Sequence, residues 1–240
     1  MKLWGTDPTT ACHAIPIVSS GVVEIAGITL LADLSGALVW DEQRLLVVSD
    51  LHLEKGSSFA ARGTLLPPFD TIATLGRLSA VIARYNPRSV IALGDSFHDR
   101  HAHARLSGDD RATIAGLQVG RDWIWISGNH DPALPPDVGG VVASDIAIGA
   151  ITFRHEPTGA HGEIAGHLHP KARVSTRGRS MERRCFACDG DRAVMPAFGA
   201  YAGGLSIRDV AFAKIFQSLG FIAHVLGDRS VHSIAAARCY

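Results

Sequence analysis

Residues 44–50 read RLLVVSD, a continuous apolar run that ends in the polar pair Ser49-Asp50. Such a run is typical of a strand buried on both faces of a sheet, and functional groups commonly follow the carboxyl ends of such strands. The segments SVIALGD (89–95) and DWIWISGNHD (122–131) have the same form. Together the three segments predict buried strands whose polar ends share one rim of a sheet.

The stretches between these strands have helical spacing. Apolar positions recur at intervals of three and four from Phe69 to Tyr85, and Pro87 closes the segment. A second helix is expected from near Asp109 to about Val119. Upstream, residues 21–50 alternate short β-branched runs with glycines and a polar turn, which predicts three or four strands. The order strand, helix, strand, helix, strand predicts a sheet with helices packed against it.

The pattern changes after Pro132. Residues 150–157 and 162–170 resemble two strands with no helix between them, and residues 171–207 resemble hairpins with a Gly-rich tail. An α/β (mixed α+β) fold is therefore expected, with either one mixed sheet or two stacked sheets. Because no repeat or low-complexity linker interrupts the chain, we expect a single domain over residues 1–240.

Composition narrows the class of protein. The 240 residues include 23 Lys and Arg against 23 Asp and Glu, so a uniformly basic nucleic-acid-binding surface is excluded. A hydrophobic fraction of 47% and a charged fraction of 19% are those of a folded chain. Four irregularly spaced cysteines argue against a disulfide framework, and neither an export signal nor a membrane-spanning run is seen. We expect a cytoplasmic protein without membrane association.

Polar clusters with metal-binding atoms lie at the ends of the predicted strands. They are Asp50-Leu51-His52, Gly94-Asp95, Gly128-Asn129-His130-Asp131, His155 and Gly166-His167-Leu168-His169. Their carboxylate, imidazole and amide groups suit Mn²⁺, Fe²⁺ or Zn²⁺ and are too rich in nitrogen for Ca²⁺. The set holds more ligands than one ion needs, and a bridging carboxylate can hold two ions ~3.5–4 Å apart.

These clusters, in this order, resemble the motifs of the calcineurin-like metallophosphoesterase superfamily: DxH, GDxxD, GNH(D/E), a lone His and GHxH. The second motif is one residue longer here between Asp95 and Asp99, so Asp95 is assigned as a ligand and Asp99 is left without a role. The resemblance implies two stacked mixed β-sheets flanked by helices, with the metal motifs within residues 49–170 and C-terminal strands within 171–240. It also implies the ligand sets, which are Asp50, His52 and His169 for one ion, Asn129, His155 and His167 for the second, and Asp95 as the bridge.

The same resemblance implies the reaction. Two cations lower the pKa of a water molecule between them, and the hydroxide attacks phosphorus in line. His130 would stabilise the phosphoryl oxygens or protonate the leaving oxygen, and Asp131 would orient its ring.

Further stretches resemble the bacterial ligase-associated DNA-damage-response endonuclease (PdeM-type) group. They are residues 49–56 (SDLHLEKG), 155–157 (HEP), 162–170 (GEIAGHLHP) and 195–205 (MPAFGAYAGGL). This resemblance implies a phosphodiesterase, with Mn²⁺ as the expected metal and Fe²⁺ or Zn²⁺ as alternatives, that cleaves single-stranded or nicked DNA in repair. It also implies a gene cluster with a DNA ligase, an exonuclease and a helicase.

Several basic or aromatic residues are candidates for substrate contacts. Residues 171–184 carry six Lys and Arg against one Glu, a net charge of +5, directly after the His167 and His169 motif. The candidates are Lys55, Arg100, Tyr201, Lys171, Arg173, Arg177 and Arg179. A solvated Lys55 and an ordinary solvated hairpin are the alternatives, and Phe198 is expected in the core rather than stacked on a base.

Other features are left open. His98, His101 and His103 follow Asp95 and are expected to contact ligands or substrate rather than metal. Cys185 and Cys188 have half of a zinc-ribbon spacing with no second half nearby, so structural zinc is not expected. Two other functions remain as alternatives to a DNA endonuclease. These are hydrolysis of nucleotides or other small phosphodiesters, and a non-catalytic interaction scaffold. Intact His130 argues against the scaffold.

Overall fold

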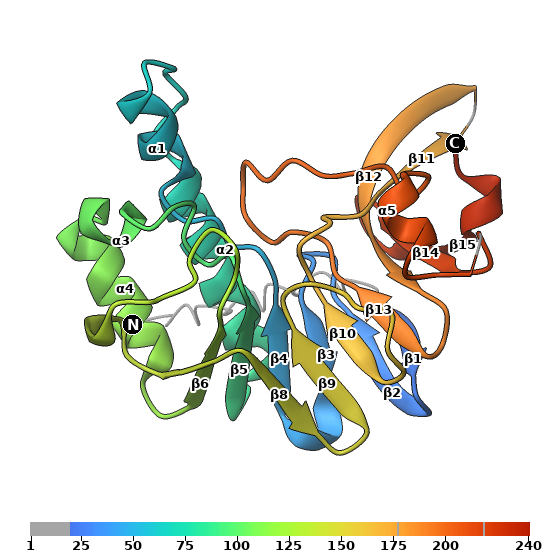
Figure 1. Ribbon diagram of the computed structural model, residues 1–240, viewed down its shortest axis with the longest axis horizontal. Helices are drawn as coiled ribbons and strands as arrows, with labels where there is room; N and C mark the ends of the chain where they lie inside the picture. The colour runs from blue at the N-terminus through green and yellow to red at the C-terminus, as the bar shows by residue number, and fades with distance from the viewer. Residues whose placement is uncertain (1–19, 177, 218) are drawn as a thin grey trace, which may run out of the picture.

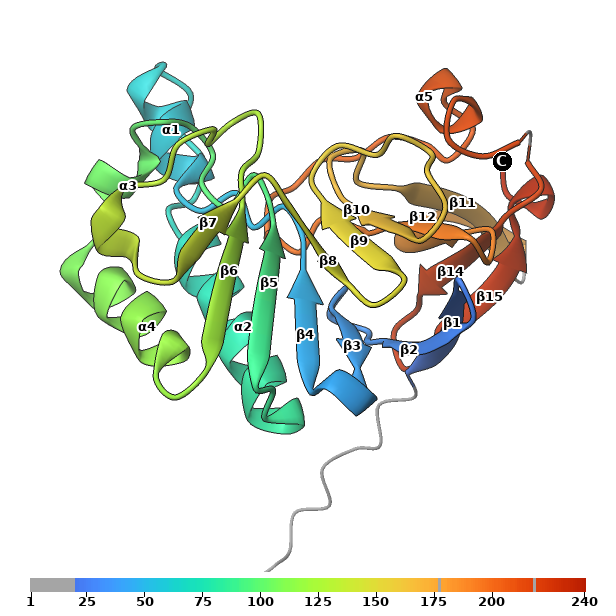
Figure 2. The ribbon, with the colours of Figure 1, turned by 60° about the horizontal axis from the view of Figure 1, so that its bottom comes forward.

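The computed structural model describes residues 20–176, 178–217 and 219–240. The elements form two β-sheets that lie against each other, with helices on the outer side of the first sheet (Figures 1 and 2). The two sheets follow the chain order, because the first is built from β1 to β7 and the second from β8 to β15.

The strands of the first sheet are β1 (Gly21–Ile25), β2 (Ile28–Ala32), β3 (Leu38–Trp40), β4 (Leu45–Val48), β5 (Ser89–Leu93), β6 (Asp122–Ile126) and β7 (Val141–Ala143). Those of the second are β8 (Asp145–Ile148), β9 (Ile151–Arg154), β10 (Glu163–Ala165), β11 (Lys171–Thr176), β12 (Arg179–Cys188), β13 (Arg192–Val194), β14 (Ile222–Leu226) and β15 (Val231–Ala235). The helices are α1 (Lys55–Ala61), α2 (Asp70–Tyr85), α3 (Ala102–Arg105), α4 (Gly108–Gln118) and α5 (Val210–Ala213), with short 3₁₀ turns at Asp41–Gln43, Pro136–Val138 and Ala236–Arg238.

The first sheet is mixed. Strands β1 to β4 are antiparallel neighbours, whereas β4, β5, β6 and β7 run parallel. The parallel strands β4 and β5 are the predicted apolar runs, and every residue from Leu45 to Val48 is buried. Strands of this kind are covered on both faces, here by α2 and α4 on one side and by the second sheet on the other (Figure 2).

The second sheet has the order β15-β14-β12-β13-β10-β9-β8, and β11 pairs with β12 outside this path. Strand β10 runs parallel to both β9 and β13. Strands β11 and β12 form a long antiparallel hairpin whose outer part extends from the body of the molecule (Figure 1).

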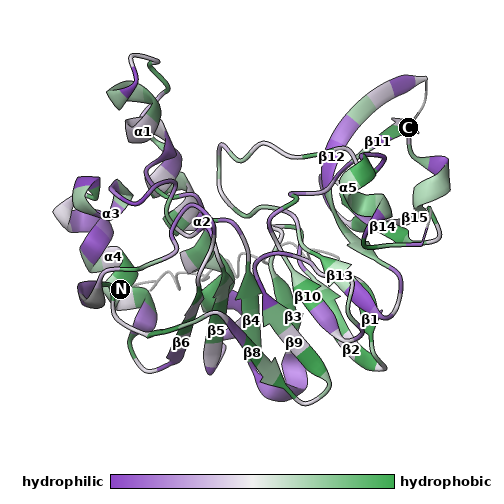
Figure 3. Ribbon diagram, viewed as in Figure 1, coloured by the Kyte–Doolittle hydropathy of each residue, from purple (hydrophilic) through white to green (hydrophobic). Residues whose placement is uncertain are grey.

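The described core has three hydrophobic clusters. One lies between the helices and the first sheet, and a second joins the sheets, with Ile91 and Ile126 from the first and Phe153 and Phe186 from the second. The third packs the outer face of the second sheet against α5. Figure 3 shows the strands in the middle of the molecule as predominantly hydrophobic, whereas the outer part of β12 carries hydrophilic residues. Burial of these faces holds both sheets in one arrangement.

The predicted mixed α/β fold with two stacked sheets is confirmed, and the helices over 70–85 and 108–118 begin and end close to the expected residues. Four strands, β1 to β4, occupy residues 21–50. The sequence did not predict α1, α5 or the short strands β7 and β8. The C-terminal strands expected within residues 171–240 include β14 and β15, whose individual bounds the sequence did not give. Among the described residues no helix is both long and apolar enough to span a bilayer. The single domain and the cytoplasmic location stay predictions.

Candidate metal centre

The parallel register of the first sheet brings three predicted ligand segments to one rim. Val48 is paired with Ala92, and Leu93 with Ile126, so β4, β5 and β6 end side by side. Asp50, Asp95 and Asn129 follow these three strand ends. Parallel neighbouring strands in this register end at the same edge of the sheet, so the residues that follow them lie close together.

The second sheet places His155 and His167 beside the same rim. Parallel pairing of Ala165 with Arg154 aligns the ends of β9 and β10, after which His155 and His167 follow. The sheets approach closely here, since the backbone N–H of His167 donates to Asp50 Oδ2 at 3.0 Å. Gly94 is required at this approach, because a Cβ there would overlap the ring of His155.

The structure assembles two groups of potential ligands. Asp50, His52 and His169 form one group, in which His169 Nε2 lies 3.1 Å from Asp50 Oδ1 and 3.4 Å from His52 Nε2. Asp95, His155 and His167 form the other.

Asp95 lies between the groups. Its Oδ2 is 3.4 Å from His155 Nε2 and 4.0 Å from His52 Nε2. Asn129 Oδ1 lies 3.0 Å from His155 Nε2 and adds an amide oxygen to the second group. All seven predicted ligands are thus together, with Asp95 positioned to serve both groups, and their coordination of metal stays a prediction.

Burial and charge set the protonation of these side chains. Burial opposes the charge on Asp95, but the hydrogen bonds and charges of His155, His130 and His52 together outweigh burial and lower the pKa of Asp95 to about 2. The pKa of Asp50 is also lowered, because the combined effects of His169, His155 and His52 outweigh its burial. Burial lowers the pKa of His52 to about 3, so its ring is neutral. Two anionic carboxylates beside a neutral imidazole are the state that metal binding requires.

The backbone at the centre is strained. Five of the predicted ligands have positive φ: Asp50 (53°), His52 (44°), Asp95 (46°), His167 (69°) and His169 (47°). Residues with a side chain rarely adopt this left-handed conformation, and such strain concentrates at functional sites. The strained turns aim successive donors at one point, and the sequence pattern gave no signal for them.

The donor set fits two divalent cations. Asp50 Oδ1 is buried and makes no hydrogen bond of acceptable geometry within the described chain, although His169 Nε2 is 3.1 Å away. A buried carboxylate oxygen in this state is costly unless a cation completes its environment. Carboxylate, imidazole and amide donors match Mn²⁺, Fe²⁺ or Zn²⁺, and the donors do not select among these ions.

Metal binding is expected to release a proton from His155. Burial opposes its charge, but the hydrogen bond with Asp95 and attraction by Asp50 raise the pKa of His155 to about 9 in the metal-free protein. Below that pH the ring holds a proton that a cation must displace, so metal affinity should rise with pH up to about 9. Titration calorimetry of Mn²⁺ near neutral pH, in buffers of different ionisation enthalpy, should detect this proton. A binding enthalpy independent of the buffer would contradict the prediction.

His130 lies at the open side of the centre. Its Nε2 is 3.9 Å from Asp95 Oδ2, its backbone N–H donates to Asp95 Oδ1 at 2.8 Å, and its side chain is 40% exposed. The ring is held by a hydrogen bond between Nδ1 and the carbonyl oxygen of His98 at 2.7 Å. Because Nδ1 donates to a carbonyl, Nε2 is left to face a substrate. His52, His98 and His130 form a further group of potential donors.

Asp131 was expected to orient the ring of His130, but in the structure its carboxylate bonds to backbone N–H groups instead. Its Oδ1 accepts from the backbone N–H groups of Asp95 and Gly128, and its Oδ2 accepts from that of Phe97, at 3.0–3.1 Å. Burial raises the pKa of Asp131 to about 6. Asp131 therefore fixes the two metal-binding loops to each other, and the backbone of His98 orients His130.

Replacing Asp131 with alanine is expected to lower the free energy of unfolding by about 3 kcal/mol or more, because three buried backbone N–H groups lose their hydrogen-bond acceptor. Urea denaturation followed by circular dichroism measures this loss. Asp122, whose side chain is 69% exposed, is the matched control, and Asp122→Ala should change stability by less than about 0.5 kcal/mol. Equal stability of the two variants would contradict the role of Asp131 in holding the two metal-binding loops together.

The predicted substrate residues outside the basic hairpin differ in their exposure to solvent. Lys55 opens α1 and is partly buried, and burial lowers its pKa. Arg100 is exposed in the loop after Asp95. Tyr201 is partly buried in the segment that crosses beneath the first ligand loop, where Gly199 N donates to Asp50 O. Phe198 is fully buried in the first core cluster, as expected for a core residue.

The predicted basic hairpin is β11–β12, and much of its charge is paired. Lys171 and Arg173 lie 3.6 and 3.8 Å from the carboxylate of Glu182, and Arg183 lies 2.9 Å from Asp228. Arg179 is exposed, and Arg177 lies outside the described residues. Exposed ion pairs are weak, so they do not prevent these side chains from contacting a phosphate.

Asp99 and the cysteine pair have structural positions. Both oxygens of Asp99 accept from the guanidinium of Arg105, at 3.1 and 2.7 Å. Burial alone would raise the pKa of Asp99, but its hydrogen bonds and the charge of Arg105 hold that pKa well below its usual range. Cys185 and Cys188 are buried and point into different core clusters, as residues three apart on a strand must. The two thiols therefore do not form one zinc site.

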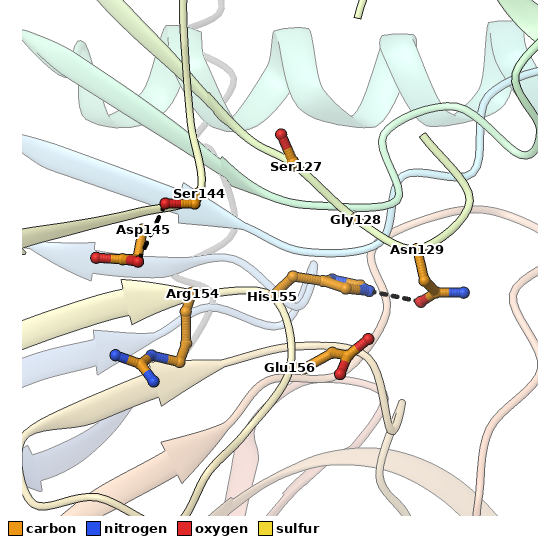
Figure 4. A pocket seen from close by; sticks show the side chains of 8 residues that line it. All are labelled: Ser127, Gly128, Asn129, Ser144, Asp145, Arg154, His155 and Glu156. Atoms are coloured by element: carbon orange, nitrogen blue, oxygen red, sulfur yellow. Dashed lines mark hydrogen bonds between the residues drawn. The ribbon is translucent and has the colours of Figure 1, made fainter. Parts of the chain in front are cut away.

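A cavity of 320 Å³ opens beside the second ligand group (Figure 4). The residues lining it are Ser127, Gly128, Asn129, Ser144, Asp145, Arg154, His155 and Glu156. Figure 4 shows the ring of His155 directed towards Asn129, whereas Arg154 points away from them. Nε of Arg154 lies 3.4 Å from the buried carboxylate of Glu163.

Comparison with solved structures matches the crystal structure of the Pseudomonas putida nuclease MPE. The TM-score is 0.69 at 28% sequence identity, covering 90% of this chain and 100% of that one. A second match, the phosphoesterase Yfce from E. coli, has a TM-score of 0.39 at 11% identity, covering 80% and 98% of the respective chains. This second match is too distant to support an inference. The chain matches no family model and no curated protein.

Proposed function

We propose that this chain, whose fold is similar to that of the nuclease MPE, is a two-metal phosphodiesterase that cleaves DNA internally. The observation that carries the proposal is the pair of adjacent ligand groups at the strand ends, with the carboxylate of Asp95 between them. The similarity to a nuclease over nine-tenths of the chain supports a nucleic acid as substrate.

The predicted ligands would hold the cations that the reaction needs. Two divalent cations, when bound, make a water nucleophile available near neutral pH and offset the charge that develops on phosphoryl oxygens. Asp50, His52 and His169 would hold one cation, and Asn129, His155 and His167 the other.

His130 stands beside the ligands with its Nε2 free of the backbone contact that holds Nδ1. In its imidazolium form, with a proton on each ring nitrogen, it would donate a hydrogen bond from Nε2 to a phosphoryl oxygen or transfer that proton to the leaving oxygen. We further propose weaker substrate contacts from Lys55, Arg100 and Tyr201, and from the hairpin residues Lys171, Arg173, Arg177 and Arg179.

A second candidate is hydrolysis of nucleotides or other small phosphodiesters. The pairing of Lys171 and Arg173 with Glu182 favours it, because this pairing reduces the positive field that the hairpin offers to a long polyanion. The zero formal charge of the whole chain favours it as well. A scaffold without activity is the third candidate, and it has no need of His130 next to the ligands.

Purified protein with Mn²⁺ and circular single-stranded DNA tests the proposal. Conversion of circles to linear strands, lost in Asp95→Ala, is the expected result. Turnover of an aryl phosphodiester with intact DNA circles would favour the second candidate. Absence of both activities, with two ions bound, would favour the scaffold.

We further propose that Mn²⁺ is the resident metal and that the protein acts in DNA repair with a DNA ligase, an exonuclease and a helicase. The oxygen and nitrogen donors support Mn²⁺ without selecting it over Fe²⁺ or Zn²⁺. Reconstitution with each ion in turn, followed by nicking assays, tests the metal. Affinity capture with the tagged chain in repair-induced cells tests the partners.

A further inference from the structure

A row of rings leads from the candidate metal centre onto helix α1. The rings of His130 and His98 stack with centroids 5.2 Å apart and planes at 24°. Phe59 lies beyond His98, at 5.9 Å and 31°. The ammonium of Lys55 is 5.9 Å from the centre of the Phe59 ring. The row starts at the partly exposed His130 and ends at the partly exposed Phe59.

Helix α1 is tied to the centre by its position in the chain. It begins three residues after His52, and the segment before it is fixed by the hydrogen bond from His98 N to Leu53 O at 2.9 Å. The loop before α1 and the loop after Asp95 are therefore joined by backbone hydrogen bonds beside the ligands. A substrate group lying on α1 is at the edge of the reaction centre.

Three residues of this helix and its cap share a face. Lys55, Phe59 and Arg62 are spaced four and three apart, which places them on one side of a helix. The ammonium of Lys55 lies over the ring of Phe59, and the guanidinium of Arg62 donates a hydrogen bond to Ser58 Oγ at 3.0 Å. We call Lys55, Phe59 and Arg62 the α1 face.

The three acids beside this face are Glu54, Asp70 and Asp99, and Asp99 is paired with the guanidinium of Arg105. Glu54 accepts a hydrogen bond from the hydroxyl of Thr71 at 2.9 Å, and the buried Asp70 accepts from the backbone N–H of Gly56 at 3.1 Å. The α1 face therefore presents a ring between two cations. This combination suits a nucleic-acid strand, in which bases and phosphates alternate.

We propose that the α1 face binds single-stranded DNA, with Phe59 stacked on an unpaired base next to the scissile phosphodiester and with Lys55 and Arg62 on the flanking phosphates. The inference rests on the proposed DNA cleavage. It names the residues that would contact such a strand, and it requires an unpaired base, because a base in a duplex is stacked between its neighbours and has no free face for Phe59. Stacking of one base on an aromatic side chain changes affinity about tenfold or more.

The test compares two substrates of equal charge. Wild-type protein with Mn²⁺ should cleave an oligothymidylate about tenfold more efficiently than an abasic oligonucleotide of the same length. In Phe59→Leu, which keeps apolar volume and removes the ring, that ratio should fall close to one. Phe59→Tyr should restore it. Phe69→Leu is the matched control, because Phe69 is 62% exposed in the loop that follows α1 and should keep the wild-type ratio.

The results separate the two proposals. A wild-type ratio in Phe59→Leu, or a ratio lost equally in Phe59→Tyr, would overturn the role of the α1 face while leaving DNA cleavage in place. Failure of the wild type to cleave either oligonucleotide, with steady turnover of methyl p-nitrophenyl phosphate, would overturn DNA as the substrate.

Discussion

Asp95→Ala is expected to remove both metal ions and to lower phosphodiester hydrolysis at least ~10³-fold, since the loss of metal-ion catalysis costs several kcal/mol of transition-state stabilisation. The reason is position, because Oδ2 of Asp95 lies 3.4 Å from His155 and 4.0 Å from His52, between the two ligand groups. Metal content by plasma mass spectrometry and the rate on an aryl phosphodiester measure the two effects.

Asp99→Ala is the matched control, four residues further along the chain. Asp99 is occupied by the guanidinium of Arg105 and belongs to neither ligand group. Its loss should leave two ions bound and change the rate far less than loss of Asp95. One ion per chain in Asp95→Ala would contradict the bridging position, and equal losses in the two variants would contradict the assignment of Asp95.

His130→Ala is expected to lower the rate of DNA cleavage by ~10²–10⁴-fold with metal content unchanged. His130 contacts Asp95 through its backbone N–H, which alanine retains, so the ligand loops should keep their geometry. If the ring protonates the leaving oxygen, the loss should be much smaller on p-nitrophenyl esters, whose leaving group needs little protonation. Rates on both substrates, with metal content measured in parallel, check the prediction.

The control for His130 is another exposed histidine. His161 has a side chain that is 69% exposed and lies 3.3 Å from Asp191, outside the ligand groups. His161→Ala should cleave DNA at the wild-type rate. Loss of metal from His130→Ala would mean that His130 acts as a ligand, and an equal loss on both substrates would point to charge stabilisation rather than proton transfer.

The first sheet and the ligand segments were predictable because each followed from local pattern. Apolar runs such as Leu45–Val48 can be buried only as inner strands, and parallel register then fixes where Asp50 and Asp95 meet. Helix α2 followed from its apolar spacing and from the proline beyond its end.

Contacts between distant segments were not predictable. Asp131 follows His130 in sequence, which suggested a contact with its ring. In the structure Asp131 bonds to the backbone of the loop that carries Asp95. The positive φ angles of the ligands likewise arise from the close approach of the two sheets, which no local pattern records. The ion pair between Arg183 and Asp228 joins two hairpins that are far apart in the chain, so the +5 charge of residues 171–184 overstated the positive field of this surface.

Helix α1 was missed for a related reason. Its seven residues, KGSSFAA, contain glycine and two serines and have little helical preference of their own. Its place is secured by tertiary contacts, since Gly56 N bonds to Asp70 and Glu54 N bonds to Thr71, both at the start of α2. Lys55 was a predicted substrate contact, whereas the place of Phe59 and Arg62 beside it became apparent only in three dimensions.

Nicking of circular single-stranded DNA during a stepwise Mn²⁺ titration tests the central claim most directly. We expect no cleavage by metal-free protein, and activity that rises with added Mn²⁺ and saturates at two equivalents per chain. DNA circles that stay intact when two equivalents are bound, or full activity at a single equivalent, would contradict a two-metal DNA phosphodiesterase.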